Sequence, residues 1–211
     1  MRMEKIDFDG VRNLMFDLGG VIMDIRRENC VEALTSLGME GADEMLGLYC
    51  QSGPFLLLEE GKISPEEFRK EMRGRIKKNV TDAELDEAFN KFLIGIPVAR
   101  LRALQELRKR FKIYMLSNTN PIMFGSKIKD EFEKDGLCRE DYFDGICVSL
   151  EELCAKPDPQ IFKNAVRKFN IKPEETVFFD DSRTNLDAAE SLGFRTCLVA
   201  PGTEFMDAFK L

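Results

Sequence analysis

The sequence contains no histidine among its 211 residues. Histidine is the side chain most often used for proton transfer near neutral pH, so this chemistry must come from carboxylates, lysine or a metal ion. Cysteine is present six times, but no two cysteines show CxxC spacing, and without histidine they cannot complete a mixed zinc site. We therefore expect reduced thiols and a cytoplasmic protein.

Long apolar stretches and basic blocks are also missing. No stretch approaches the ~20 apolar residues that a membrane span requires, and the charged first residues, 1–7, lack the apolar centre of a signal peptide. The chain has 31 basic against 38 acidic side chains and a net charge of −7, without a basic run that could follow a phosphate backbone. We expect neither a membrane nor a nucleic acid as partner. Monomer and homodimer both remain open.

The 44% of hydrophobic residues can form one substantial domain, or one domain with a smaller insertion. Short apolar runs enriched in β-branched and aromatic residues predict strands. These runs cover residues 14–16, 113–116, 146–149, 177–179 and 197–199. Residues 98–110 and 159–169 between them have helical periodicity. This alternation predicts an α/β fold with a doubly wound, Rossmann-like parallel sheet.

The interval between the first two predicted strands is too long for a single crossover. Ser64 and Thr81 each open a capping box, a pattern typical of helix N-termini, and residues 28–37 and 43–50 are further helix candidates. We therefore predict a small four-helix domain at residues 26–96. It is inserted into a core domain that residues 1–25 and 97–211 form.

Polar residues follow four of the predicted strands. They are Asp17 after the first, Ser117 and Asn118 after the second, Lys156 after the third, and Asp180 and Asp181 at the end of the fourth. Because the carboxyl ends of parallel strands meet at one edge of a sheet, we expect these side chains to converge there. Three carboxylates that close require a cation. The hydroxyl and amide groups suit a phosphate, and Lys156 is the nearest basic side chain.

Each of these signals has an ordinary structural explanation when taken alone. The segment after residue 116 can be a turn, Lys156 a solvated charge, and Asp180 with Asp181 an Asx turn that caps a helix beginning near Thr184. Their order along the chain carries more information. The stretches that matter are NLMFDLGGVIMD (13–24), YMLSNTN (114–120), AKPDPQIF (155–162) and VFFDDSRTNLDAAESLGF (177–194).

Together these four stretches resemble the haloacid dehalogenase-like hydrolase superfamily, and the resemblance covers essentially the whole chain. It implies that the helical insertion is a cap over the site. The chain looks similar to the branch that contains bacterial α-D-glucose-1-phosphate phosphatases, which shares the Asp-Leu-Gly opening. The resemblance thus implies an Mg²⁺-dependent phosphatase for a small phosphorylated metabolite, such as a hexose 1-phosphate.

The resemblance also implies a role for each motif residue. Asp17 would attack phosphorus to form an aspartyl-phosphate, which water then hydrolyses. The Mg²⁺ ligands would be Asp17, the Gly19 carbonyl, Asp181, and Asp180 directly or through a water. Ser117 and Asn118 would orient the phosphoryl oxygens. Lys156 would neutralise charge and hold Asp17 in place.

The sequence departs from the family pattern at Gly19. Most phosphatases of the superfamily carry a second aspartate there as general acid and base, and its loss typically costs about a hundredfold to ten-thousandfold in rate. The substrate can have a better leaving group, such as an anomeric oxygen, or turnover can be slow. Alternatively, Asp24 or a cap carboxylate such as Glu59 or Glu60 stands in.

Two other functions remain open. A 2-haloacid dehalogenase also forms a covalent intermediate on its aspartate, without a metal, but its reaction does not require the acidic pair Asp180–Asp181. A catalytically weak protein that binds a phosphorylated metabolite would gain nothing from the anionic Asp17 facing an anionic ligand. Candidate contacts to the substrate outside the motifs are Arg26, Arg27, Phe55 and Glu59. Arg26 and Arg27 could bind a sugar or an acidic group, but a charged pair that opens a helix is usually solvated, and we favour that explanation for them.

Overall fold

A computed structural model describes residues 6–47 and 51–209. Its centre is a five-stranded sheet with the order β5-β4-β1-β6-β7, and every strand pair in it is parallel. The strands are β1 (Asn13–Phe16), β4 (Lys112–Ser117), β5 (Gly145–Val148), β6 (Thr176–Asp180) and β7 (Arg195–Leu198). All five predicted strands are therefore present, each within two residues of its predicted bounds.

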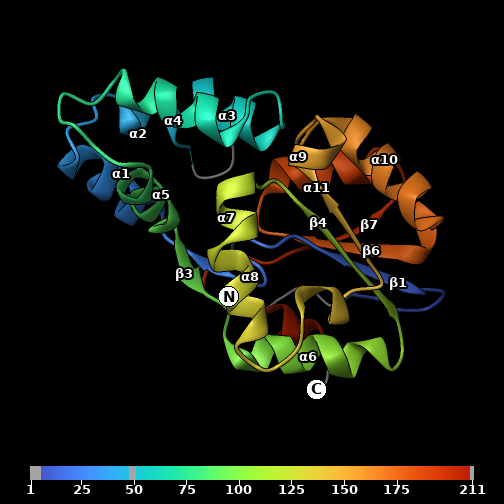
Figure 1. Cartoon of the computed structure of the whole chain (residues 1–211). Coiled ribbons are helices and arrows are strands. Elements are labelled where there is room, and N and C mark those ends of the chain that lie inside the picture. The colour runs from blue at the N-terminus through green and yellow to red at the C-terminus, as the bar shows by residue number, and fades with distance from the viewer. Residues whose placement is uncertain (1–5, 48–50, 210–211) are drawn as a thin grey trace.

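Helices cover both faces of the sheet (Figure 1). Consecutive side chains of a strand point to opposite faces, and here both faces are buried, as is usual for parallel sheets. Leu14 belongs to the same buried cluster as Leu101 of α6 (Val98–Arg108), whereas its neighbour Met15 packs in a second cluster with Phe162 of α10 (Pro159–Phe169). The second cluster also includes Leu186 of α11 (Arg183–Glu190). The predicted doubly wound fold is confirmed.

The insertion is helical and lies to one side of the sheet (Figure 1). Its helices are α1 (Arg27–Ser36), α2 (Ala42–Met45), α3 (Gly53–Glu59), α4 (Pro65–Arg73) and α5 (Asp82–Asn90). Phe55, Phe68 and Phe89 form its aromatic centre, with ring centroids 5.2 to 5.3 Å apart. The four-helix prediction thus missed α3. The predicted helix over 43–50 ends at Met45, and its residues 48–50 lie outside the described part of the chain.

Both predicted capping boxes are present. The Ser64 hydroxyl accepts a hydrogen bond from the Glu67 amide at 3.2 Å, and the Glu67 carboxylate accepts one from the Ser64 amide at 2.7 Å. Thr81 and Glu84 repeat this exchange at 3.3 and 2.8 Å. Each box satisfies backbone donors that the first helical turn leaves free, and this fixes where α4 and α5 begin.

Two short strands that the sequence did not predict join the insertion to the sheet. They are β2 (Asp24–Ile25) and β3 (Leu93–Gly95), and they pair in antiparallel fashion. The chain therefore enters and leaves the insertion through one two-stranded ribbon. The exact division of the chain into residues 26–96 and the remainder stays a prediction.

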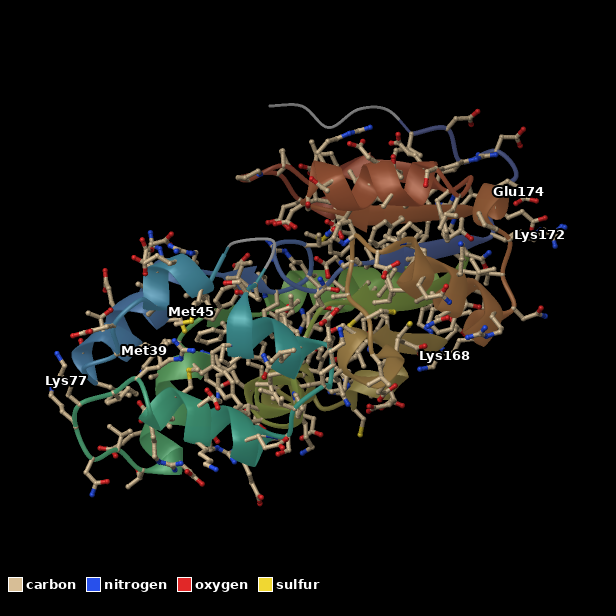
Figure 2. All side chains as sticks on the ribbon, turned by 90° about the horizontal axis from the view of Figure 1, so that it is seen from above. Met39, Met45, Lys77, Lys168, Lys172 and Glu174 are labelled. Carbon is tan, nitrogen blue, oxygen red and sulfur yellow. The ribbon has the colours of Figure 1, made fainter. Side chains whose placement is uncertain are left out.

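The remaining elements are short connections around the sheet. They are α7 (Pro121–Gly125), α8 (Lys127–Glu133), α9 (Ser149–Glu152), and the 3₁₀ turns η1 (Arg139–Asp141), η2 (Pro173–Glu175) and η3 (Phe205–Ala208). The molecule is elongated: Figure 2 shows Lys77 at the outer end of the insertion and Lys172 at the opposite end, beside the sheet. Within the described residues, no helix has the length and apolar character that crossing a membrane requires.

Candidate active site

The parallel register of the sheet brings the predicted acids together. Phe16 lies opposite Phe179 in the β1–β6 pair, and the Asp17 amide donates to the Phe179 carbonyl at 2.8 Å. Asp17 and Asp180, the next residues of the two strands, therefore reach the same edge of the sheet. This is the edge at which open parallel sheets bind their ligands.

Lys156 lies between these two carboxylates. Its ammonium is 2.8 Å from Asp17 Oδ1 and 2.7 Å from Asp180 Oδ2, and the whole lysine is only 3% exposed. Burial by itself would lower the pKa of Lys156, but the charges of Asp17 and Asp180 outweigh it and raise this pKa. The amine is therefore cationic, and its two partners compensate for the cost of removing it from water.

Asn118 fixes the backbone that carries this lysine. The Asn118 side-chain amide donates to the Lys156 carbonyl at 2.9 Å, and its oxygen accepts from the Lys156 amide at 2.8 Å. The Lys156–Pro157 peptide bond in this segment is cis. A carboxamide has two N–H donors, so one donor of Asn118 remains for a ligand. Ser117 is 1% exposed and lines a small hollow of about 60 Å³ next to Asn118.

Asp181 completes the acidic group. Asp17, Asp180 and Asp181 each offer an oxygen atom, and these three atoms lie within 4.8 Å of one another. Burial, strengthened by the charges of Asp17 and Asp180, raises the pKa of Asp181 to about 7. Burial is also the main reason that the pKa of Asp17 rises to about 6, against the lowering effect of Lys156.

This donor set fits Mg²⁺. Hard divalent cations prefer carboxylate oxygens, and three carboxylates beside one ammonium leave an excess of negative charge. Asp180 has the fewest free lone pairs, because it also accepts from the Ser182 amide at 2.8 Å and from the Asn185 carboxamide at 3.0 Å. A contact through a water therefore suits Asp180 better than a direct one, whereas Asp17 and Asp181 can bind directly.

The glycines after Asp17 have different tasks. Gly20 has a φ of +76°, and a Cβ atom there would overlap the Asp181 carboxylate, so this position needs a glycine for Asp181 to come close. Gly19 lines the cavity, and the nearest atoms to a Cβ there would be 3.6 Å away, on Ile25. Sterics alone do not demand a glycine at position 19. Its proposed role as a carbonyl ligand stays a prediction.

The cavity above the acids has a volume of about 70 Å³. The core contributes Asp17, Gly19, Asn118, Lys156, Asp181 and Asn185 to its lining, and β2 contributes Ile25. Gln51, Glu59 and Phe92 come from the insertion. The insertion therefore covers the acids as a cap, in agreement with the sequence-based expectation.

Glu59 at the end of α3 is the carboxyl group that the cap adds to this cavity. Burial in the first place, and the charge of Asp17 in the second, raise the pKa of Glu59 to about 8. Gln51 also faces the cavity, and its Oε1 atom is buried without a hydrogen-bond partner. No sequence motif pointed to Gln51 or Phe92. Asn185 could have been found, because it stands in the first turn of α11, the helix that directly follows the acidic pair.

The other residues that the sequence suggested as substrate contacts do not line the cavity. Arg26 is exposed, Arg27 binds Asp43 and the Leu46 carbonyl, and Phe55 is buried in the aromatic centre of the cap. Arg26 and Arg27 thus agree with the favoured explanation of an ordinary charged pair at the start of a helix. Phe55 turns away from the cavity, and the sequence did not reveal which face of its helix does so.

Two of the carboxylates considered as replacements for the missing acid are engaged elsewhere. Asp24 binds Arg100 at 2.7 Å, and Arg100 also holds Glu204. Glu60 pairs with Lys62 at 2.8 Å, and neither Asp24 nor Glu60 lines the cavity. Glu59 is the one candidate of the three that does.

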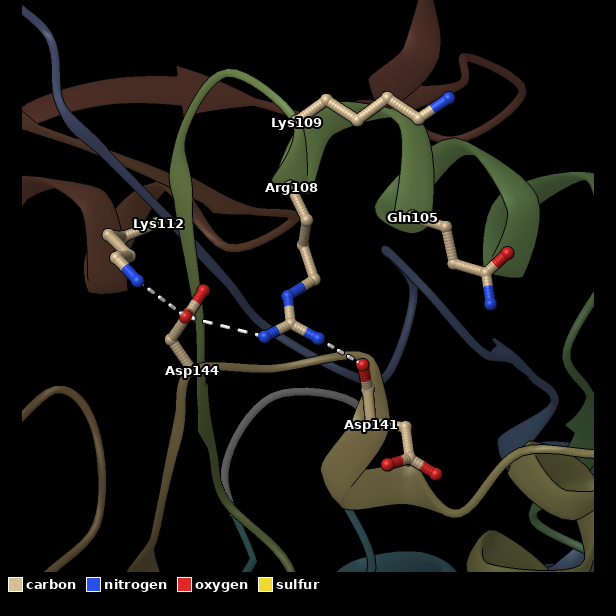
Figure 3. A pocket seen from close by; sticks show the side chains of 6 residues that line it. All are labelled: Gln105, Arg108, Lys109, Lys112, Asp141 and Asp144. Carbon is tan, nitrogen blue, oxygen red and sulfur yellow. Dashed lines mark hydrogen bonds and ion pairs between the residues drawn. The ribbon is translucent and has the colours of Figure 1, made fainter.

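A larger hollow of about 400 Å³ lies at the opposite edge of the sheet, where β4 and β5 begin (Figure 3). Its cations are already satisfied by nearby acceptors. Lys112 and Arg108 lie 3.0 and 3.3 Å from Asp144, and Arg108 also donates to the Asp141 carbonyl. None of the motif residues lines this hollow.

Comparisons with known proteins agree with this geometry. The family described as haloacid dehalogenase-like hydrolase matches residues 11–193. A D-ribitol-5-phosphate phosphatase of Bacteroides thetaiotaomicron is 37% identical over 186 residues, which are 88% of this chain and 90% of that protein. A phosphorylated carbohydrates phosphatase of Thermotoga maritima is 27% identical over 85% of this chain and 81% of its own length.

Solved structures give the same result. A HAD family enzyme of B. thetaiotaomicron, in complex with magnesium and inorganic phosphate, is 38% identical and has a TM-score of 0.89, covering 95% of this chain and all of that one. An L-2-haloacid dehalogenase shares the fold at a TM-score of 0.58, but only 16% of the sequence, over 92% of this chain and 88% of its own. The chain belongs to the haloacid dehalogenase-like hydrolase family.

Proposed function

We propose that this chain hydrolyses a small, uncharged sugar or polyol that carries one phosphate group, through a covalent intermediate on Asp17. The family and the related phosphatases make it a phosphoric monoester hydrolase, and relatives crystallised with magnesium and phosphate support Mg²⁺ as its cofactor. One observation carries the proposal for the residues: Asp17 lies 2.8 Å from a buried lysine and within an acid cluster, at the floor of a capped cavity.

In the proposed mechanism the Asp17 carboxylate attacks phosphorus, and the bond from phosphorus to the ester oxygen breaks. Lys156 keeps Asp17 ionised and oriented, and the free N–H of Asn118 together with the Ser117 hydroxyl holds the phosphoryl oxygens. Water then attacks phosphorus of the aspartyl-phosphate, which restores the Asp17 carboxylate and releases inorganic phosphate, and the proton that water loses returns to the group that protonated the leaving oxygen. Mg²⁺, held by Asp17 and Asp181 with the Gly19 carbonyl, would supply charge neutralisation at the phosphoryl group.

We propose Glu59 as the acid that protonates the leaving oxygen in place of the side chain missing at Gly19. Glu59 shares the cavity with Asp17, whereas Asp24 and Glu60 are paired outside it. Its raised pKa favours the protonated form that a general acid requires. Its location in the cap supports this role, because the leaving group would lie on the cap side of the phosphoryl group.

The lining of the cavity supports a hydroxylated leaving group. On the cap side, Glu59 and the unpartnered Gln51 Oε1 can accept hydrogen bonds, while Ile25 and Phe92 add apolar surface. Lys156 is the cation among the lining residues, and Asp17 and Asp180 already neutralise it. A second phosphate or a carboxylate on the substrate would therefore find no free positive partner among these residues.

Hexose 1-phosphates and pentitol 5-phosphates both fit this description. The former come from the sequence resemblance, and the latter from the related D-ribitol-5-phosphate phosphatase. We place the reaction in the cytoplasm, because Cys30, Cys147 and Cys154 are buried as free thiols. Such thiols suit a reducing compartment.

Hydrolysis of p-nitrophenyl phosphate with and without Mg²⁺, followed by a panel of phosphorylated metabolites, tests this function. We expect Mg²⁺-dependent turnover, at least a ten-thousandfold loss in Asp17→Asn, and near-normal activity in Asp187→Asn. Asp187 is a matched control, because it is an exposed aspartate paired with Arg183. Turnover that is independent of Mg²⁺, or activity that survives in Asp17→Asn, would overturn the proposal.

A further inference from the structure

The first residue of α9, Ser149, is fully buried and contacts the loop that follows β4. Its hydroxyl oxygen accepts a hydrogen bond from the Thr119 amide at 3.0 Å. Thr119 lies directly after Asn118 and two residues after Ser117, the residues assigned to the phosphate. Ser149 therefore helps to fix the shape of the loop that binds the phosphoryl group, although it does not line the cavity.

The same hydroxyl also reaches the cap. It donates to the Glu59 carbonyl at 2.6 Å, and a second acceptor, the Thr119 carbonyl, lies at 3.1 Å. A serine hydroxyl has one proton, so it can serve only one of these two acceptors at a time. The shorter distance belongs to the cap. If the cap lifts, the proton can turn to Thr119, and no buried polar group is left unsatisfied.

The cap segment after Glu59 touches the core by its backbone. Gly61 has a φ of +62°, and a Cβ atom there would overlap the Leu150 carbonyl oxygen. Position 61 therefore needs a glycine, both for its left-handed conformation and for this close approach. Residues 59–61 of the cap and Ser149 with Leu150 of the core form one contact, which we call the docking point.

We propose that Ser149 is a positioning residue that couples the seating of the cap to the shape of the phosphate-binding loop. With the cap seated, the hydroxyl joins the Glu59 carbonyl to the Thr119 amide, and the Glu59 side chain is held over Asp17. With the cap lifted, Glu59 leaves the cavity. The consequence for catalysis rests on the proposed phosphatase function, whereas the contact itself does not.

Steady-state kinetics of Ser149→Ala, Gly61→Ala and the double variant test this coupling. With a phosphorylated polyol that the wild type turns over, we expect Ser149→Ala to lose about tenfold in kcat/KM, because two hydrogen bonds disappear. Gly61→Ala should raise KM for the polyol phosphate by a similar factor, with the KM for p-nitrophenyl phosphate unchanged, since that leaving group has no hydroxyl for the cap. The kcat/KM of the double variant should be no lower than that of Ser149→Ala alone, because both substitutions disrupt the same contact.

Two control variants separate the docking point from general effects. Ser36→Ala removes an exposed cap hydroxyl that bonds only within α1, and Gly41→Ala strains a left-handed glycine of the cap whose nearest neighbours are side chains of the cap itself. Both should keep wild-type kinetics within about twofold. The coupling would be overturned if the kcat/KM losses of the two single variants added fully in the double variant. It would also be overturned if Gly41→Ala raised KM as much as Gly61→Ala does.

Amide hydrogen exchange gives a second measurement that needs no turnover and no ligand. Ser149→Ala should speed exchange both at Thr119 and in cap residues 60–62, whose amides bond only to the end of α3. Gly61→Ala should speed exchange in residues 60–62 and, because the cap and the loop are coupled through Ser149, also at Thr119, where the effect should be smaller than in Ser149→Ala. Unchanged exchange in residues 60–62 of Ser149→Ala contradicts the proposal. If instead the wild type hydrolyses no phosphate ester while these exchange patterns hold, the phosphatase function fails and the docking point stands.

Discussion

The floor and the roof of the cavity are built differently. On the floor, Lys156 is locked to Asp17 and Asp180, and these two carboxylates also accept hydrogen bonds from the backbone amides of Leu18 and Ser182. On the roof, Gln51 has an unpartnered oxygen, and the Glu59 carboxyl forms no hydrogen bond or ion pair within the described part of the chain. Fixed groups suit a reaction centre that treats every phosphate alike. Groups with spare hydrogen-bonding capacity suit the part of the substrate that varies.

This contrast gives a rule for variants. A change on the floor should reduce the hydrolysis of every ester by the same factor, because every ester contains the phosphoryl group. A change on the roof should separate esters according to their leaving groups.

Lys156→Met should have the largest effect. It removes the cation between Asp17 and Asp180, so we expect about a thousandfold loss of kcat with all esters and a loss of about 3 to 5 kcal/mol in the free energy of unfolding. Kinetics with p-nitrophenyl phosphate and a sugar phosphate, together with urea unfolding, measure both. Lys168→Met is the control, because Lys168 forms only partly exposed ion pairs. A loss confined to one class of ester would contradict the assignment of Lys156 to the floor.

Glu59→Gln should separate the esters. For sugar or polyol phosphates, whose alkoxide leaving groups need a proton, we expect about a hundredfold lower kcat. For p-nitrophenyl phosphate, whose leaving group departs as a stable anion, the loss should be below about threefold. Glu60→Gln changes the neighbouring carboxylate, which is paired with Lys62, and should leave both rates unchanged. Equal losses for both classes of ester would show that Glu59 is not the acid.

Stabilisation by Mg²⁺ should depend on pH. The pKa values of Asp17 and Asp181 are raised to about 6 and about 7, so without metal these acids favour folding at low pH and cost stability as the pH rises from about 4 to 7. Mg²⁺ displaces their protons. At a hundredfold excess of Mg²⁺ over its Kd, we expect the free energy of unfolding to rise by about 2.7 kcal/mol at pH 8, which corresponds to a Tm increase of about 5 to 10 °C. At pH 5 both increases should be much smaller. A Tm shift that is equal at both pH values would contradict the acid cluster as the metal site.

The sequence predicted the floor well and the roof poorly, and the reason is physical. Asp17 and Asp180 stand at the carboxyl ends of the buried strands β1 and β6, and parallel strands in register must deliver such residues to one edge. Lys156 follows β5 after the short helix α9 and returns to the same edge. Gln51 follows no such rule, because its place depends on how a helical cap packs on a sheet. Ser149 does follow a strand, β5, but its hydrogen bond to the Glu59 carbonyl of the cap was not foreseeable from that position. Phe55 illustrates the limit: it lies in the same helix as Glu59, yet it packs inside the cap while Glu59 reaches the cavity. The pairing of β2 with β3 was missed for the same reason.

Gln51→Leu should give the smallest change and the most specific test of the roof. The Gln51 Nε2 group donates to the Gly47 carbonyl at 3.1 Å, but Oε1 is buried without a partner, which is costly in the free protein. Leucine removes that cost, so the Tm without substrate should stay equal or rise slightly. A substrate hydroxyl would lose its acceptor, so KM for a polyol phosphate should rise about fivefold, while KM for p-nitrophenyl phosphate stays constant. Higher stability together with weaker binding of hydroxylated substrates is the pattern expected of a side chain that is kept for its ligand. A lower Tm with unchanged KM would instead assign Gln51 to the packing of the cap.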